Sequence, residues 1–268
     1  MTNEPVPSDL YTNDYYRTSC QGYEEFAISR GGILPPRLDV PFRLANIQPG
    51  MRVLDVGCGR GEVVFHAAQK GATVWGIDYA AEAVKIARDT LAEVLPEELK
   101  PQVTIGLSDA KKLPLPDNAI DRIFMLDVVE HLYPDELHTA LCEALRVLVP
   151  GGQLIIHTMP NLWYYYYGYP IYRFLQGLRG QKLPANPRHR FPYGHLHVNE
   201  QTPARMKKAI AECGFETKVW LFPIQDYSYE KNGVVRKGME FLTQVYPFRW
   251  VFCNDIFGVA TKPAQRRG

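Results

Sequence analysis

Val53-Leu54-Asp55-Val56-Gly57-Cys58-Gly59-Arg60-Gly61 is the stretch that decides the fold. Its first four residues form a short β-prone run, and the glycines that follow permit a sharp turn into a helix and a close approach of a ligand to the backbone. A dinucleotide-binding fingerprint would place its third glycine at position 62, where this chain has Glu62. The loop therefore favours a nucleoside ligand without phosphates.

Short β-prone runs and helical stretches alternate outward from this loop. We predict strands at 52–56, 73–77, 103–106, 120–126 and 153–158, with helices at 60–69, 80–94 and 134–148. Pro150-Gly151-Gly152 marks the turn from the last of these helices into its strand. The alternation predicts βαβ units with right-handed crossovers, and hence an α/β fold with a parallel sheet.

The alternation of predicted strands and helices ends after residue 158. Residues 159–200 contain the aromatic run Trp163-Tyr-Tyr-Tyr-Tyr167 and several prolines. Regular elements resume with a helix at 202–213, a strand at 215–222, a helix at 230–246 and a final strand at 250–260. We therefore predict an N-terminal helical lead over 1–48 and a core over 49–268. The core carries an insertion at about 159–200, in which Trp163 to Phe174 form an aromatic helical lid packed on the core.

Composition excludes several classes of protein. With 268 residues, 46% of them hydrophobic, the chain can bury one large core. Lys and Arg number 30 against 29 Asp and Glu, so no nucleic-acid partner is expected. The five cysteines are scattered without CxxC spacing, as in a reduced protein without a disulfide framework or zinc site. Since the sequence has neither a signal-peptide pattern nor eighteen consecutive apolar residues, we expect a cytoplasmic protein.

Asp78 ends the second predicted strand, about twenty residues beyond Gly57, where a carboxylate can accept hydrogen bonds from both hydroxyls of a ribose. The alternative role is to cap the helix that begins near Ala80. Because the glycine loop precedes it, we favour ligand binding.

Together these segments resemble the class I methyltransferases that depend on S-adenosyl-L-methionine (SAM), in particular their type 11 branch. The matching segments are 53–61, Gly76-Ile-Asp78-Tyr79, Ser108-Asp109-Ala110, Phe124-Met-Leu-Asp127-Val-Val-Glu130-His131-Leu132 and the turn at 148–154. The resemblance covers residues 50–160. It implies a Rossmann-like, seven-stranded, mostly parallel sheet with helices on both faces, an antiparallel last strand, and SAM as the cofactor.

The resemblance also assigns roles to individual residues. Asp55 would orient the loop, Asp78 would hold the ribose and Asp109 would meet the adenine. Tyr79 would form an apolar wall of the cleft. The expected cofactor-binding set is Asp55, Gly57, Cys58, Gly59, Asp78, Tyr79, Asp109, Ala110 and Asp127.

Methyl transfer from a sulfonium is an in-line displacement, in which positioning can supply about 7–11 kcal/mol. A hydroxyl acceptor also benefits from a general base. The candidate catalytic bases are His131, His195 and His197, each of which could instead be a structural histidine. Because His195 and His197 alternate on an extended segment, at most one of them should face the site.

A metal site is the alternative for part of this set. Asp127-x-x-Glu130-His131 is similar to the Glu-x-x-Glu-His signature of metal-dependent ubiquinone-pathway and small-RNA O-methyltransferases. Asp127 replaces the first Glu of this signature with a shorter side chain, and relatives that use no metal have the same residues. No metal is therefore predicted.

The acceptor is indicated by the insertion. Its aromatic run is flanked by Arg173, Arg179, Lys182, Arg188 and Arg190, which suits a phosphate-bearing or lipid-linked glycan acceptor and contact with a membrane surface. The layout resembles methyltransferases of bacterial glycan and natural-product pathways. We expect O-methylation of a small-molecule, glycan or glycolipid acceptor. Two alternatives remain: N- or C-methylation of a natural-product intermediate, and a role as a catalytically silent SAM-binding partner protein.

Overall fold

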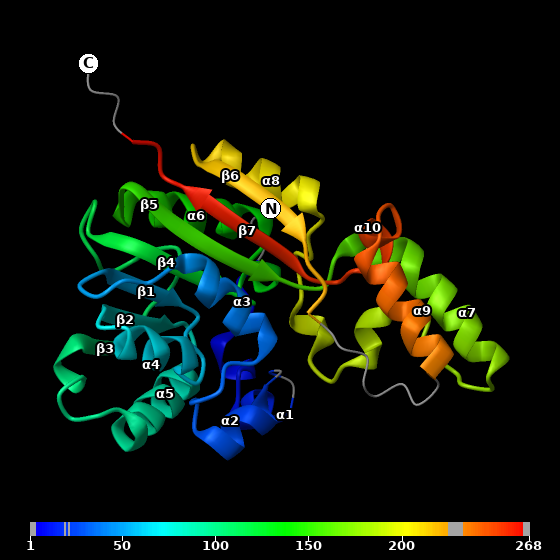
Figure 1. Cartoon of the computed structure of the whole chain (residues 1–268), viewed down its shortest axis with the longest axis horizontal. Coiled ribbons are helices and arrows are strands. Elements are labelled where there is room, and N and C mark those ends of the chain that lie inside the picture. The colour runs from blue at the N-terminus through cyan, green and yellow to red at the C-terminus, as the bar shows by residue number, and fades with distance from the viewer. Residues whose placement is uncertain (1–3, 19, 21, 225–232, 265–268) are drawn as a thin grey trace.

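A seven-stranded sheet forms the centre of the molecule in the computed structural model, which describes residues 4–18, 20, 22–224 and 233–264 (Figure 1). The strands lie in the order β3-β2-β1-β4-β5-β7-β6. Their bounds are β1 Arg52–Val56, β2 Thr73–Asp78, β3 Val103–Leu107, β4 Ile120–Leu126, β5 Leu148–Thr158, β6 Glu216–Leu221 and β7 Ile256–Thr261. β1 to β5 pair in parallel, and β7 runs antiparallel to β5 and β6. The predicted Rossmann-like sheet with an antiparallel last strand is confirmed.

Helices cover both faces of this sheet. Val53 belongs to the core shared with α3 (Pro36–Ala45), α4 (Glu62–Gln69) and α5 (Ala81–Val94). Its neighbour Leu54 belongs to the core shared with α6 (Pro134–Val147) and α8 (Pro203–Glu212). Successive side chains of a strand point to opposite faces, so β1 joins the two cores.

Short helical turns complete the connections. They are the 3₁₀ helices Ser8–Leu10, Lys100–Gln102, Val129–His131, Pro187–Arg190 and Gly194–Leu196 and a π-helical turn at Tyr164–Gly168. The N-terminal lead adds α1 (Asn13–Thr18) and α2 (Tyr23–Ser29) before α3.

A separate helical lobe is formed by the chain segments that follow β5 and β6. It contains the π-helical turn, α7 (Tyr169–Leu178), α9 (Gly233–Gln244) and α10 (Phe248–Phe252), and Figure 1 shows it beside the sheet, away from α4 and α5. The Trp163 and Trp250 rings lie 6.3 Å apart, and Asn161 Nδ2 donates to the carbonyl oxygens of Trp250 and Cys253 at 2.9 and 3.0 Å. The aromatic segment thus packs on the chain's late helices.

Two element boundaries were predicted wrongly. The expected strand at 250–260 begins at Ile256, because Pro247 precedes a helix, α10, in the Phe248–Phe252 run. β5 begins at Leu148 and includes the Pro150-Gly151-Gly152 turn, with a register irregularity opposite Ile120 and Arg122. The helix expected at 230–246 is α9 over Gly233–Gln244, and positions 230–232 lie outside the described residues.

Candidate functional site

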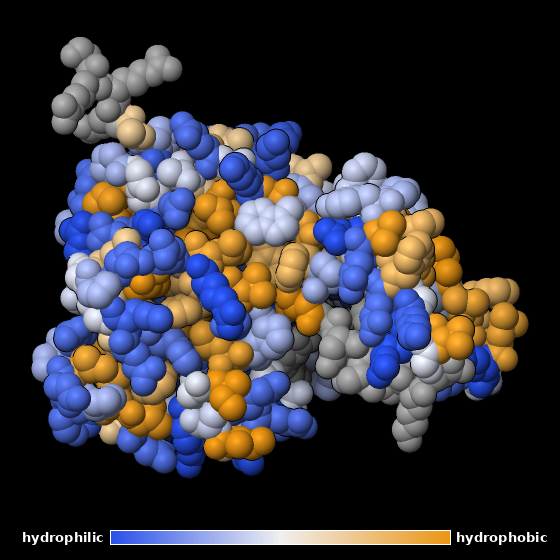
Figure 2. All heavy atoms as spheres, viewed as in Figure 1, coloured by the Kyte–Doolittle hydropathy of each residue, from blue (hydrophilic) through white to orange (hydrophobic). Residues whose placement is uncertain are grey.

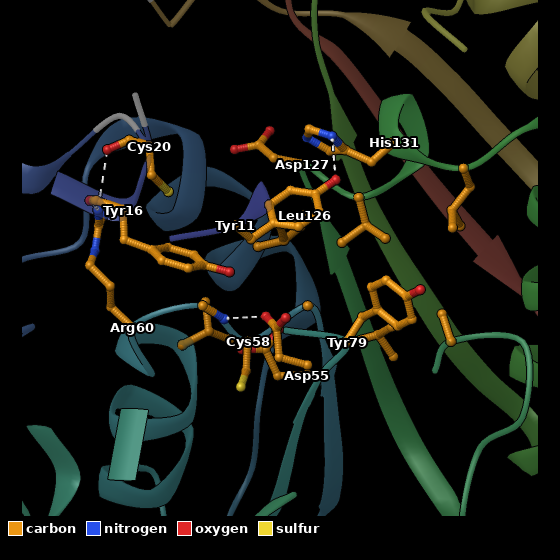
Figure 3. A pocket seen from close by; sticks show the side chains of 18 of the residues that line it. Tyr11, Tyr16, Cys20, Asp55, Cys58, Arg60, Tyr79, Leu126, Asp127 and His131 are labelled. Atoms are coloured by element: carbon orange, nitrogen blue, oxygen red, sulfur yellow. Dashed lines mark hydrogen bonds between the residues drawn. The ribbon is translucent and has the colours of Figure 1, made fainter. Parts of the chain in front are cut away.

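A pocket opens at the carboxyl ends of β1, β2 and β4 and encloses about 1130 Å³ of space, part of it open to solvent. Parallel α/β sheets bind ligands at this edge, where the strand order reverses. Figure 3 shows side chains from the N-terminal lead on one side of the pocket and from the strand ends on the other. All nine predicted cofactor residues line the pocket: Asp55, Gly57, Cys58, Gly59, Asp78, Tyr79, Asp109, Ala110 and Asp127.

Asp78 ties the glycine loop to the end of β2. Its Oδ2 accepts a hydrogen bond from Gly59 N at 3.0 Å, and its Oδ1 accepts one from Ala80 N at 2.9 Å. Burial raises the pKa of Asp78, while the backbone hydrogen bonds oppose that rise. The same carboxylate therefore orders the loop, holds the turn before α5 and faces the pocket.

Gly57 meets two requirements at once. Its φ of +74° lies in the left-handed region, and a Cβ there would come within 2.4 Å of Val128 Cγ2. The first glycine of the loop therefore lets the ends of β1 and β4 approach each other.

The other predicted acids occupy distinct environments. Asp55 is buried, and burial together with Asp78 and Glu62 raises its pKa to about 8. Asp109 accepts from Lys111 N at 2.9 Å and pairs with Lys111 Nζ at 3.3 Å. Tyr79 is exposed at the pocket rim. An adenosine would thus meet carboxylates at the ends of two neighbouring strands.

Asp127 follows β4 with a φ of +56° and is held on both oxygens. Arg37 donates to Oδ2, and His157 Nδ1 lies 2.5 Å from Oδ1. Burial alone would raise the pKa of Asp127, but His157 and Arg37 outweigh it and hold the pKa below its usual range. With both oxygens engaged, Asp127 shapes the pocket wall.

The structure brings two of the three candidate histidines together and leaves the third apart. His131 lines the pocket, and its ring lies edge-on to His197 with centroids 4.9 Å apart. His131 Nδ1 lies 3.1 Å from the Tyr11 hydroxyl and 3.2 Å from the Leu196 carbonyl oxygen. Burial and His197 lower the pKa of His131 to about 3. His195 is exposed and stacks on Tyr193, outside the pocket lining.

The N-terminal lead forms one side of the pocket. Tyr11, Tyr15 and Tyr16 line it, whereas among the described lining residues none comes from 159–200. The predicted aromatic lid at 163–174 is therefore not the element that covers this pocket. Sequence analysis missed Tyr11, Arg37 and His157. The clustering of tyrosines in the lead was the available signal for Tyr11, whereas Arg37 and His157 had none.

Two groups of metal-ligating side chains occur among the described residues: Glu130, His131 and His197, and His138, Cys142 and Cys213. In the first, Glu130 accepts from the Thr158 hydroxyl at 2.7 Å, and burial raises its pKa to about 8. In the second, the two sulfur atoms lie 3.3 Å apart. The five cysteines are free thiols, as expected, yet two that are distant in sequence are neighbours in space.

Comparison with known proteins gives one consistent family. The family model described as "Methyltransferase domain", of type 11, matches residues 54–156. Methyltransferase GfsG of Streptomyces halstedii is 39% identical over 112 residues, which are 41% of this chain and 38% of that protein. The ubiquinone/menaquinone biosynthesis C-methyltransferase UbiE of Bordetella avium is 28% identical over 178 residues, 62% and 65% of the two chains. This chain thus spans less than two thirds of either relative.

A solved structure shares the fold more completely. It belongs to the complex of the Haloferax volcanii Trm112 methyltransferase activator with a methyltransferase, and it matches 97% of this chain and 100% of that chain, with a TM-score of 0.63 at 16% identity. In the part of the chain that the structure describes, no helix is long and apolar enough to cross a bilayer. The matched segment holds the glycine loop, Asp78 and Asp109 around one pocket, and over residues 54–156 the chain is similar to the type 11 branch of the class I SAM-dependent methyltransferases.

Proposed function

We propose that this protein transfers the methyl group of SAM to an oxygen atom of a small-molecule or glycan acceptor. The observation that carries the proposal is a single pocket that has the cofactor motifs on one wall and His131 with Tyr11 on the other. A bound sulfonium methyl would therefore lie in the same space as a neutral imidazole.

The residues present fit the cofactor. Asp78 offers a carboxylate to a ribose, and Asp109 offers one to an adenine amino group. A Cβ at Gly59 would come no closer than 4.0 Å to another residue, the nearest atom being Tyr16 Cε1, so the backbone is accessible there. When bound, SAM supplies an electrophilic methyl group. The chain's own task is to orient the acceptor, exclude water and accept a proton.

His131 is suited to accepting that proton. The Leu196 carbonyl oxygen can only accept, so the tautomer that satisfies it carries the proton on Nδ1, with the Tyr11 hydroxyl oxygen as a second acceptor, and leaves the Nε2 lone pair available. With its pKa lowered to about 3 by burial and by His197, the imidazole is neutral at neutral pH. It is a weak base, which suffices because a hydroxyl becomes strongly acidic as its oxygen bonds to the methyl carbon.

C-methylation is the second candidate, because the Bordetella relative is a C-methyltransferase. The same neutral imidazole could accept a proton from a carbon that has been methylated.

The test has two parts. Calorimetry should show SAM and S-adenosylhomocysteine binding. Transfer of a deuterated methyl group from SAM is then followed across phenols, polyketide alcohols, sugars, lipid-linked glycans and amines, and mass spectrometry with NMR locates the label. Binding without transfer to any acceptor would favour a silent partner protein. A label on nitrogen or carbon would overturn the O-methyl assignment.

His131→Gln tests the base. We expect a fall in kcat of about 10²–10⁴-fold with an unchanged dissociation constant for SAM. His189→Gln is the matched control, since His189 is exposed and lies outside the pocket lining. Equal kcat in both variants would remove His131 from the mechanism.

A further inference from the structure

Helix α7 exposes an apolar stripe. Tyr167 in the π-helical turn just before α7 and Ile171, Phe174 and Leu178 on α7 recur with helical spacing, and these side chains are 59%, 49%, 66% and 71% exposed. Leu175 beside them is 52% exposed. The buried residues of α7, Tyr169 and Gln176, lie elsewhere on the helix. In an isolated water-soluble chain this stripe has an unfavourable contact with solvent.

The other helices of the lobe repeat the pattern. On α9, Val234 and Phe241 are 82% and 53% exposed, and Val245 just beyond the helix is also exposed. Trp250 on α10 is 52% exposed. Figure 2 shows apolar residues gathered over the outer end of the lobe. Patches of this kind on a soluble protein mark an interaction surface.

The charge of residues 159–199 indicates which kind of partner the lobe would bind. From Met159 to Asn199 the sequence has no Asp or Glu and carries the cations Arg173, Arg179, Lys182, Arg188 and Arg190. Arg188 forms an ion pair with Glu200. Arg179 and Lys182 are exposed just beyond the apolar stripe of α7. Aromatic and aliphatic side chains edged by exposed cations fit the interface of an anionic lipid bilayer.

The lobe also lies on the side of the molecule where the site opens. Its first segment leaves the sheet after Thr158 at the end of β5, and its second returns to the sheet at Ile256, which pairs with Thr158. This is the carboxyl edge of β5, the same edge at which the pocket opens beside β1, β2 and β4. A bilayer contacted by the lobe would therefore border the approach to the pocket.

We propose that the outer face of the helical lobe, formed by the stripe on α7, the exposed apolar residues of α9 and α10, and Arg179 with Lys182, docks on an anionic membrane surface and that the acceptor is presented there on a lipid. The second part rests on the proposed function, whereas docking does not depend on turnover. A second copy of the chain is a less fitting occupant, because two such cationic segments would repel each other.

The docking test uses the full chain and vesicles of phosphatidylcholine alone or mixed with phosphatidylglycerol. We expect co-sedimentation with the mixed vesicles, little with phosphatidylcholine alone, and release by high salt. Failure to bind the mixed vesicles would overturn the proposal. The proposal would also be overturned if light scattering showed a stable dimer of the wild-type chain that does not bind vesicles and that Phe174→Asp dissociates.

Matched variants locate the surface. Phe174→Asp with Leu178→Asp should weaken vesicle binding by at least about tenfold, because the variant loses the burial of two apolar side chains and adds two anionic charges. Ile28→Asp is the control, because Ile28 is 83% exposed and lies on α2, away from the lobe. Arg179→Glu with Lys182→Glu should also weaken binding, while Lys85→Glu with Lys207→Glu should not. Equal binding of lobe and control variants would contradict the assignment.

The acceptor part is tested separately. Phe174→Asp with Leu178→Asp should retain SAM affinity and activity on a soluble acceptor analogue but lose activity on a lipid-linked acceptor in vesicles. An equal loss on both acceptors would argue against membrane presentation. If vesicle binding follows the predicted pattern while no acceptor is methylated, the proposed function fails and the docking surface stands.

Discussion

His157 on β5 lies between two acidic side chains. Its Nδ1 is 2.5 Å from Asp127 Oδ1, and its Nε2 is 3.4 Å from Asp255 Oδ1. Arg37 from the N-terminal lead binds the other oxygen of Asp127. The charges of two cationic and two anionic side chains therefore balance in the interior. The contact between Arg37 and Asp127 also joins the N-terminal lead to the strands at the pocket wall.

This arrangement predicts a specific pH dependence. Burial lowers the pKa of His157, but Asp127 and Asp255 outweigh it and raise the pKa to about 10. The folded value exceeds that of the unfolded chain, near 6.5, so the contribution of His157 is complete below about pH 6.5 and is lost as the pH rises toward 10. We expect the unfolding free energy to fall over this window by up to about 1.4 kcal/mol per pH unit. Urea unfolding should show a flatter profile for His157→Gln and an unchanged one for His189→Gln.

How far the sequence predicts this molecule depends on the range of the contacts. The β1 strand, the glycine loop and Asp78 are local patterns whose spacing identifies them, and all were placed correctly. The contact of Tyr11 with His131 spans 120 residues, and that of Arg37 with Asp127 spans 90. No periodicity signals such pairs. The helix at Phe248–Phe252 was mistaken for a strand because a short apolar run does not distinguish the two.

Asp78 should be the strongest single determinant of SAM affinity. Asp78→Ala removes the carboxylate that accepts from Gly59 N and Ala80 N and that faces the pocket. Losing hydrogen bonds to a charged group costs about 1.5–3 kcal/mol, so calorimetry should find affinity lower by about 10–100-fold. Asp89→Ala, at an exposed position of α5, should bind as wild type does. Unchanged affinity in Asp78→Ala would refute the assignment of the cofactor site.

Gly57→Ala should destabilise the protein through two separable effects. The left-handed φ costs about 1–2 kcal/mol, and the contact with Val128 adds an overpacking cost of about 1–3 kcal/mol. Gly50→Ala isolates the first effect, because Gly50 also has a left-handed φ but no atom within 4 Å of an added Cβ. Chemical denaturation should give Gly57→Ala a lower unfolding free energy than Gly50→Ala. Adding Val128→Ala should reduce the loss of unfolding free energy that Gly57→Ala causes. If the double variant is less stable than Gly57→Ala alone, the contact between the added Cβ and Val128 is not the cause of the loss.

The attachment of the lead to the glycine loop should depend on one buried ion pair. Arg60 is 1% exposed, lies 2.8 Å from Glu62 Oε1, and donates to the carbonyl oxygens of Tyr16 and Cys20 at 3.0 and 3.1 Å. Arg60→Ala leaves Glu62 buried without this partner, which should cost about 3–5 kcal/mol of stability.

The same variant should also loosen the wall of the pocket. Because Tyr16 is held through Arg60, trypsin should cleave Arg60→Ala faster at Arg17, and SAM affinity should fall. Arg30→Ala is the matched control, since Arg30 forms an exposed ion pair with Glu93 at 3.6 Å, and such pairs contribute about 0–1 kcal/mol. If both variants lose stability equally, the buried pair is not what fixes the lead. If Arg60→Ala unfolds the whole chain, Glu62→Gln added to it should recover stability, because it removes the charge left buried.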